Sequence, residues 1–185
     1  MDRAVLPDPT HRPGGQSSFA HLLSHHYLGL TLPLVLGTEE QQKRFLGQAL
    51  AHNQCWCNGL NTLDRRTRLI PNGNGYRLNG IKGFCSGSVD ADLVRLTPDL
   101  GPDDHRVILL PSAQRSGLRV IDDWDAIGPR QTSNDTIHLD DGAEETDEVL
   151  DPGRWTPHGW GDRPSARSAP ELAQLNLATL HLVLA

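Results

Sequence analysis

The sequence lacks the features that define several classes of protein. No apolar run approaches the roughly 18 to 20 residues of a membrane-spanning helix, and no block of consecutive Lys or Arg is present. Glycine-rich phosphate loops, Gly-x-Ser-x-Gly elbows and internal repeats are also absent. The formal net charge is -6 and the isoelectric point is near 5.8. These properties argue against a nucleic-acid or membrane partner and favour a site for a small molecule.

Cysteine is scarce and is present in an odd number, as Cys55, Cys57 and Cys85. The start of the chain has no apolar leader, so we expect a reducing, cytoplasmic location. Cys55 and Cys57 are separated by one residue, whereas zinc-binding pairs usually have two to four between them, and no matching Cys/His pair follows. We therefore predict no metal site.

The first third of the chain predicts a flexible tail followed by a helical hairpin. Residues 1–18 are rich in Pro, Gly and polar residues without periodicity. Helical spacing of one mostly apolar stripe predicts a helix to about Leu32; the stripe consists of Phe19, Leu22, Leu23, His26 and Leu30. His26 is therefore predicted to face inward. Gly37 ends this helix, and Thr38 with Gln41 forms a capping box that starts a second helix through about His52. Residues 19–53 thus form a partial helical domain.

Residues 54–152 predict a β-domain of short strands joined by turns. Asn72 to Gly75 is a strong hairpin turn, because Asn and Gly tolerate positive φ. We expect an antiparallel sheet or barrel. The candidate strands are 55–61, 67–70, 76–82, 93–96, 107–110, 118–121, 136–139 and 148–150.

The end of the chain predicts a linker and one more helix. Residues 153–168 are loop-like, and a helix opens near Ala169 and Pro170, since proline suits a first turn. The apolar spacing continues to Leu184 with no capping residue, so we expect the chain to stop inside this helix.

Two segments offer the chemistry of a flavin site. A flavin is a broad apolar ring with a polar edge, so it needs aromatic walls and a few hydrogen-bond donors. Phe84 and Trp124 supply aromatic rings, and Ser86 is two residues from Phe84. Because side chains alternate along a strand, Phe84 and Ser86 are predicted to share one face.

These segments, 75–87 and 124–132, resemble the flavin-facing strands of the acyl-CoA dehydrogenase superfamily. The resemblance covers roughly residues 19–185, and it is strongest to the flavin-dependent monooxygenase branch, which includes dibenzothiophene monooxygenases and sulfur-acquisition oxidoreductases. True dehydrogenases usually show Trp-Ile-Thr or Trp-Ile-Ser where this chain has Phe84-Cys85-Ser86. The fold class implied is α+β: a helical hairpin, an antiparallel β-barrel-like middle domain and, at 169–185, the first helix of a truncated C-terminal bundle.

The resemblance implies a reduced-flavin monooxygenase that oxidises a sulfur or other heteroatom through a flavin hydroperoxide. The cofactor would be FMN or FAD, the substrate a small organosulfur or similar compound, and a separate reductase would supply reduced flavin. The family assembles as a homo-tetramer through the bundle, which also carries catalytic groups. Because most of the bundle is missing, we expect the chain alone to bind flavin weakly and to turn over little.

The same resemblance assigns roles to individual residues. His26, Asn58 and Ser86 correspond to catalytic positions: His26 passes a proton, Asn58 lies near the peroxide, and Ser86 hydrogen-bonds the reactive flavin nitrogen. His25 is the fallback for His26, and Asn61 is the fallback for Asn58. The predicted cofactor-binding residues are Phe84, Ser86, Trp124, Arg130 and Thr132.

Plainer structural roles stay open for all of these residues, namely core packing, turns and surface polarity. Two other functions also stay open for the whole chain. One is an acyl-CoA dehydrogenase that passes hydride to FAD, and the other is a non-catalytic remnant that acts as an interaction module.

Overall fold

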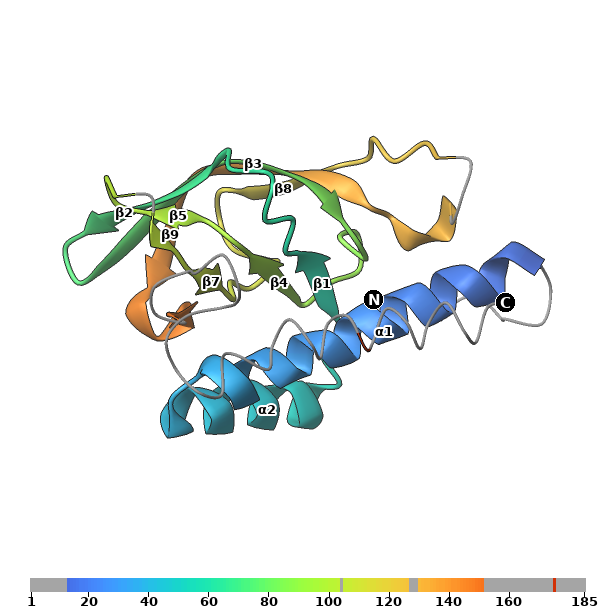
Figure 1. Cartoon of the computed structure of the whole chain (residues 1–185), viewed down its shortest axis with the longest axis horizontal. Coiled ribbons are helices and arrows are strands. Elements are labelled where there is room, and N and C mark those ends of the chain that lie inside the picture. Colours follow the sequence, from blue (N-terminus) through green and yellow to red (C-terminus); the bar gives the residue numbers. More distant parts are fainter. Residues whose placement is uncertain (1–12, 104, 127–129, 152–174, 176–185) are drawn as a thin grey trace.

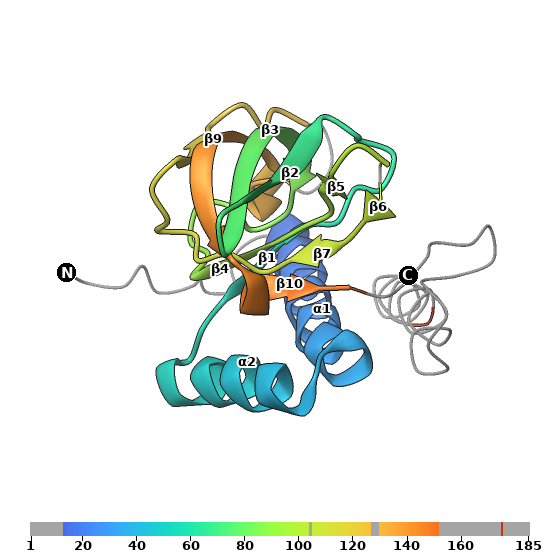
Figure 2. The same cartoon turned by 90° about the vertical axis from the view of Figure 1, so that its left-hand side faces the viewer.

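A computed structural model describes residues 13–103, 105–126, 130–151 and 175. It has three layers, with a pair of helices on one side of a small sheet and a larger sheet on the other (Figures 1 and 2). None of the helices in these ranges is long and apolar enough to cross a membrane. The predicted linker and C-terminal helix lie outside the described residues, apart from Leu175.

The helical layer consists of α1 (Pro13–Leu36) and α2 (Glu39–His52). The predicted capping box is confirmed, because the Thr38 side chain accepts from the Gln41 backbone N–H and the Gln41 side chain accepts from the Thr38 N–H. The predicted flexible tail, residues 1–18, is too long, because α1 begins at Pro13. Proline is favoured in a first helical turn, so the helix starts before the apolar spacing becomes visible.

The small sheet has the order β1-β4-β7-β10, made of β1 (Trp56–Gly59), β4 (Leu93–Leu96), β7 (Ile108–Leu109) and β10 (Val149–Leu150). β1 and β4 run parallel, whereas the other pairs are antiparallel.

The large sheet has the order β6-β5-β2-β3-β9-β8. Its strands are β2 (Thr67–Asn72), β3 (Gly75–Cys85), β5 (Asp99–Leu100), β6 (His105–Arg106), β8 (Leu118–Ile121) and β9 (Asp135–Glu145). β2 and β3 form the predicted hairpin, with Gly73 at φ +60°. β2 and β5 are parallel. The expected antiparallel barrel is therefore wrong: the domain is two mixed sheets, because the chain crosses between layers before it pairs again.

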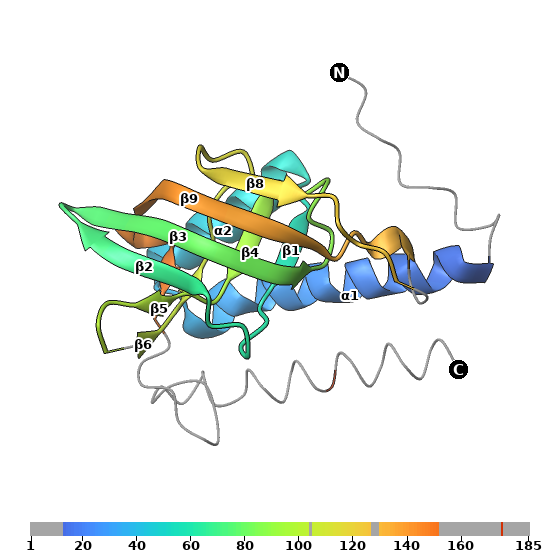
Figure 3. The same cartoon turned by 90° about the horizontal axis from the view of Figure 1, so that it is seen from above.

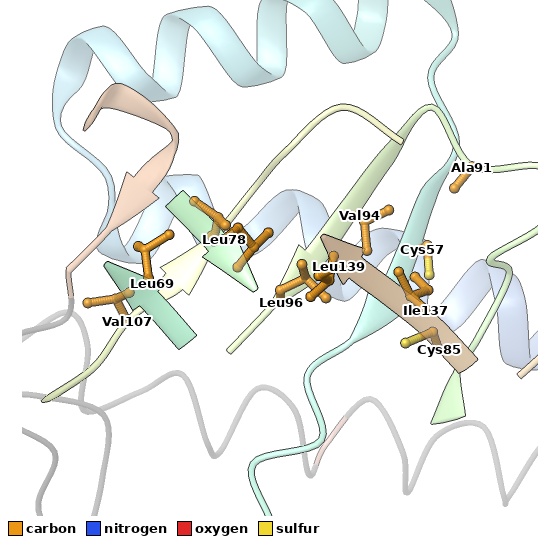
Figure 4. Packing of buried hydrophobic residues seen from close by; sticks show 11 residues of the cluster. Cys57, Leu69, Leu78, Cys85, Ala91, Val94, Leu96, Val107, Ile137 and Leu139 are labelled. Atoms are coloured by element: carbon orange, nitrogen blue, oxygen red, sulfur yellow. The ribbon is translucent and has the colours of Figure 1, made fainter. Parts of the chain in front are cut away.

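Two apolar clusters hold the layers together. One lies between the sheets, where Val94, Leu96 and Ile137 interlock (Figure 4). The other lies between the small sheet and the helices and includes Leu36 and Trp56. Successive residues of β1 and β4 face these two clusters in turn, so the small sheet is covered on both sides.

Candidate functional site

The candidate site forms where the end of β3 and β1 meet over the N-terminal half of α1 (Figures 1 and 3). Asn58 and Ser86 form an isolated antiparallel bridge. The Asn58 N–H donates to the Ser86 carbonyl at 2.9 Å, and the Ser86 N–H donates to the Asn58 carbonyl at 3.0 Å. Two residues that the sequence analysis placed in one site are therefore joined through their backbones.

The nearest side-chain partner of the Ser86 hydroxyl is a histidine that the sequence analysis missed. His21 Nε2 lies 3.1 Å from Ser86 Oγ. Ser86 is only 5% exposed, whereas His21 is half-buried. The sequence did contain a feature that points to His21: it precedes His25 by four residues and therefore lies on the same face of the helix.

His26, the predicted proton donor, has a different environment. It is half-buried, and its Nδ1 accepts a hydrogen bond from the Trp56 backbone N–H at 3.3 Å. Burial, and then the charge of Arg95, lower its pKa. The inward orientation is confirmed, but His26 binds the β1 backbone, and it is His21 that contacts Ser86.

His25, the fallback residue, packs its ring edge-on against His21 with centroids 4.4 Å apart. Its Nδ1 is enclosed and has no hydrogen-bond partner among the described residues. Burial, helped by His21 and Arg95, lowers its pKa to about 3. His25 is therefore neutral at physiological pH.

Phe84 and Ser86 do not share an environment, and this prediction is wrong. Phe84 has φ +60° and is 66% exposed, while Ser86 is buried. The β3–β9 register shifts between Lys82 and Cys85, so the strict alternation of a regular strand is lost at this point. A non-glycine residue at this φ costs roughly 1–2 kcal/mol, and such strain often accompanies functional sites.

The rings of Phe84 and Trp124 contact each other edge to face, with centroids 6.2 Å apart and planes at 77°. This spacing leaves no room for a third ring between them. The expectation of two facing walls is therefore wrong: the two rings form one aromatic patch, in which Phe84 is exposed and Trp124 is half-buried. The Trp124 backbone N–H donates to Asp135 at 3.2 Å, which anchors this segment to β9.

Arg95, on β4, is a second residue that the sequence analysis missed. It is fully buried; its Nε donates to the Cys57 carbonyl at 3.0 Å, and both terminal nitrogens lack partners within the described structure. Burial lowers its pKa to about 10. A Cβ built on Gly29 of α1 would lie 2.9 Å from Arg95 Nε, so the guanidinium packs directly under the helix. The sequence feature that could have indicated a buried Arg95 is its charge inside the otherwise apolar run Leu93–Leu96.

Asn58, on β1, is the register partner of Arg95 in the parallel pair of β1 with β4. Its Oδ1 is buried and has no partner in the described part of the chain. The fallback Asn61 lies in a turn instead, where its side-chain oxygen accepts from the Leu63 N–H at 3.2 Å.

The predicted polar segment divides into a buried and an exposed part. Thr132 is buried, and its carbonyl accepts from the Gly87 N–H at 2.8 Å. Arg130 is exposed, and its Nε donates to the Ala126 carbonyl at 3.1 Å. Both belong to η2 (Arg130–Thr132), which packs on α1. A cavity of about 110 Å³ lies against this segment and is lined by Ser18, Phe19, Leu22, Cys55, Trp56, Gly87, Val89, Asp90, Gln131, Thr132 and Ser133.

Chemically, the site combines an aromatic pair, of which Phe84 is exposed and Trp124 half-buried, with a buried hydroxyl and a half-buried imidazole. The cavity is smaller than the roughly 300–1,000 Å³ of a ligand pocket, so this cavity alone would not enclose a three-ring cofactor. Phe84 and Trp124 fit the apolar ring of a flavin, and Ser86 with His21 fits its polar edge.

Comparison with known proteins places this site in context. The chain is 33% identical over 145 residues to a dibenzothiophene monooxygenase of Rhodococcus erythropolis, covering 72% of this chain and 34% of the relative. It is 31% identical over 172 residues to a probable FMNH2-dependent monooxygenase of Pseudomonas putida, covering 91% and 42%. No family model matches the sequence.

Solved structures agree with the sequence relatives. Methanesulfinate monooxygenase from Pseudomonas fluorescens is similar with a TM-score of 0.82 and 30% identity, over 92% of this chain and 43% of that chain. A glutaryl-CoA dehydrogenase from Mycobacterium smegmatis, at a TM-score of 0.72 and 21% identity over 91% and 44%, shows the fold alone. By sequence and by fold, the chain is a homologue of the flavin-dependent monooxygenases in the acyl-CoA dehydrogenase superfamily, and it spans less than half the length of each of these relatives.

Proposed function

We propose that the chain carries the flavin-contacting part of a reduced-flavin monooxygenase that oxidises sulfur or another heteroatom in a small organic compound. The observation that carries the proposal is the hydroxyl of Ser86, which lies two residues after Phe84 and beside a helix histidine; the exposed ring of Phe84 contacts the half-buried ring of Trp124. The names of the relatives support the reaction class, because they describe FMNH2-dependent oxidation and organosulfur substrates.

In this proposal the aromatic pair binds the cofactor, which is FMN or FAD. Phe84 and Trp124 supply apolar contact along one face of the ring system. The strained backbone at Phe84 projects its ring outward, where a ligand can reach it. Bound reduced flavin would supply the electrons that activate oxygen, and a separate reductase would regenerate it.

Ser86 and Asn58 would orient the reacting groups. Both backbones are fixed by their mutual hydrogen bonds, so the two side chains hold a defined position. The Ser86 hydroxyl can donate to the polar edge of the ring, and the Asn58 side-chain amide adds a polar group close by. Ser86 is buried and the Asn58 side-chain oxygen is enclosed, so bulk water would have little access to this edge.

Flavin binding tests the proposal directly. Purified protein is titrated with FMN and with FAD, and the quenching of tryptophan fluorescence is followed. We expect saturable binding that Phe84→Ala weakens about tenfold, since a well-packed aromatic contact is worth roughly 1–1.5 kcal/mol. Ile70→Ala is the matched control, because Ile70 is an exposed apolar residue on β2.

Turnover tests the reaction class. Oxygen consumption with reduced FMN is measured with an alkylsulfinate and with dibenzothiophene, and the oxygenated products are identified by mass. Failure of both flavins to bind, or equal affinity of the Phe84→Ala and wild-type proteins, would contradict the proposed site. Because little turnover is expected from the chain alone, the assay is repeated at increasing protein concentration; oxidation of reduced flavin that rises with protein, without any oxygenated product, would contradict the monooxygenase reaction.

A further inference from the structure

We propose that Asp64 is a positioning residue for Phe84: it holds the Gly83 N–H next to that ring and so keeps the ring turned outward, where a flavin would lie. The inference rests on the proposed function, because Phe84 is the aromatic contact assigned there to the cofactor. Asp64 lies in the turn between β1 and β2, 19 residues before Gly83 in the sequence, and the Gly83 N–H donates to its Oδ2 at 3.1 Å.

The backbone just before Phe84 has left the regular sheet. β3 pairs with β9 at Lys82 and again at Cys85, with a shift of register between them, so no residue of β9 is the register partner of Gly83 or Phe84. On the other side of β3, the pairing with β2 ends earlier. Gly83 is buried, and an enclosed N–H in such a place needs another acceptor. The Asp64 carboxylate supplies that acceptor.

The conformation of Phe84 has to be held by its surroundings. Its φ of +60° is one that residues with a side chain rarely adopt. After Phe84, the chain is anchored by the two backbone hydrogen bonds between Ser86 and Asn58. Before Phe84, it is anchored by the bond from Gly83 to Asp64. Because the chain is fixed on both sides, the Phe84 ring can leave its outward position only if one anchor is lost.

The Asp64 carboxylate is itself held in one direction. Arg66 Nε donates to its Oδ1 and Arg66 Nη2 to its Oδ2, at 2.8 Å each, so Oδ2 is shared between Arg66 and Gly83. Such a two-point pair fixes the plane of the carboxylate. The hydrogen bond from Arg66 lowers the pKa of Asp64, although burial opposes the change. The Lys82 ammonium also donates to the Asp64 carbonyl at 2.7 Å, so backbone and side chain of Asp64 are both fixed against the end of β3.

Arg66 adds orientation and charge balance rather than stability. A Cβ built on Gly83 would lie 3.6 Å from Arg66 Nη2, so the guanidinium packs against the same stretch of backbone. The Asp64 side chain is 8% exposed and the Arg66 side chain 61%. An ion pair with so exposed a cation contributes little to folding by its charges. What it provides is a neutralised carboxylate with a fixed direction beside the aromatic patch.

The contact between Phe84 and Trp124 tests the inference without any flavin. The indole N–H signal of Trp124, assigned with Trp124→Phe, is recorded by NMR in the wild type, Phe84→Ala, Asp64→Ala and Asp64→Asn. The Phe84 ring shifts this signal because it lies against the indole. We expect the signal in Asp64→Ala to move most of the way to its position in Phe84→Ala. In Asp64→Asn it should lie in between, because a neutral amide offers one acceptor atom and weaker hydrogen bonds.

Glu39→Ala is the matched control, because it removes the carboxylate of an exposed ion pair with Lys43 on α2. It should leave the Trp124 signal unchanged. A signal that stays at its wild-type position in Asp64→Ala or in Asp64→Asn would overturn the inference, whether or not flavin binds. Asp64→Asn keeps the size and shape of the side chain, so it decides the question even where Asp64→Ala does not fold.

A double-mutant cycle on FMN affinity shows whether Asp64 acts through Phe84. We expect Asp64→Ala to weaken FMN binding about fivefold in the wild type but less than about twofold in Phe84→Ala, because the second protein has no ring left to position. Equal weakening in both backgrounds would mean that Asp64 acts independently of Phe84 and would overturn the inference. Failure of all the proteins to bind FMN would contradict the proposed function, and the Trp124 signal would still decide whether Asp64 positions the ring.

Discussion

Lys82 predicts an unusual pH dependence of stability. This lysine is fully buried in β3, and its Nζ donates to the carbonyls of Asn61 and Asp64 at 2.6 and 2.7 Å and to Thr97 Oγ1 at 2.9 Å. Burial lowers its pKa from 10.5 to about 8, although the charge of Asp64 opposes this change. The three hydrogen bonds keep the Lys82 ammonium in the fold, but its burial still reduces the stability of the folded protein when the lysine is charged.

The sign and the size follow from proton linkage. Between pH 8 and 10.5 the unfolded chain still holds the lysine proton, while the folded chain has begun to release it. The unfolded state binds more protons, so the free energy of unfolding rises with pH in this window. For these two pKa values the gain between pH 8 and pH 10 is about 2 kcal/mol.

The assay compares urea unfolding of the wild type and Lys82→Met at pH 7, 8, 9 and 10. Subtraction of the variant removes the contributions of tyrosines and of Cys57, whose pKa is raised by its hydrogen bond to Cys85 and by burial. We expect the unfolding free energy of the wild type, minus that of Lys82→Met, to increase as pH rises. Lys43→Met, on an exposed part of α2, should give a flat difference. A flat or falling difference for Lys82→Met would refute the argument.

Three further predictions concern the site and its surroundings. Phe84→Gly should be about 1 kcal/mol more stable than Phe84→Ala in urea unfolding, because both lose the ring and only glycine relieves the positive φ; equal stabilities would mean an unstrained backbone. A thiol reagent should label Cys55 in the folded protein, and Cys57 and Cys85 only after unfolding, since both are buried; rapid labelling of all three would contradict the packing. The pKa of His25 is lowered in the fold, so the unfolded chain takes up the His25 proton first as pH falls. The free energy of unfolding should therefore drop by at most about 1.5 kcal/mol from pH 6.5 to 5 in the wild type, and His25→Phe should lack this drop. Equal pH dependence of the unfolding free energy in the two proteins would argue against a neutral His25.

Much of the local structure could be predicted because local sequence determines it. The capping box at Thr38 and Gln41 and the turn from Asn72 to Gly75 depend on residues three or four positions apart. The parallel pairings of β1 with β4 and of β2 with β5 join residues 37 and 31 positions apart, and periodicity does not relate such distant segments. Most of the strands were therefore predictable from the sequence, whereas the pairing of the strands into two mixed sheets was not.

The site shows the same division. The resemblance selected Asn58 and Ser86, and the structure brings them together. Periodicity correctly turned His26 inward, but it could not show which turn of α1 meets the end of β3, and that turn carries His21. The prediction for Phe84 failed because it assumed a regular strand, whereas a register shift and a positive φ interrupt the alternation there.

The close approach of Gly29 to Arg95 makes these two distant positions interdependent. A methyl group at position 29 would lie 2.9 Å from Arg95 Nε, which is closer than normal contact distance, so the arginine side chain or the helix would have to shift. Relatives with a larger residue at the first position should therefore carry a shorter, uncharged residue at the second. A double-mutant cycle of Gly29→Ala and Arg95→Met should show that the second change rescues the first, which would make this pair an epistatic unit beneath the helix.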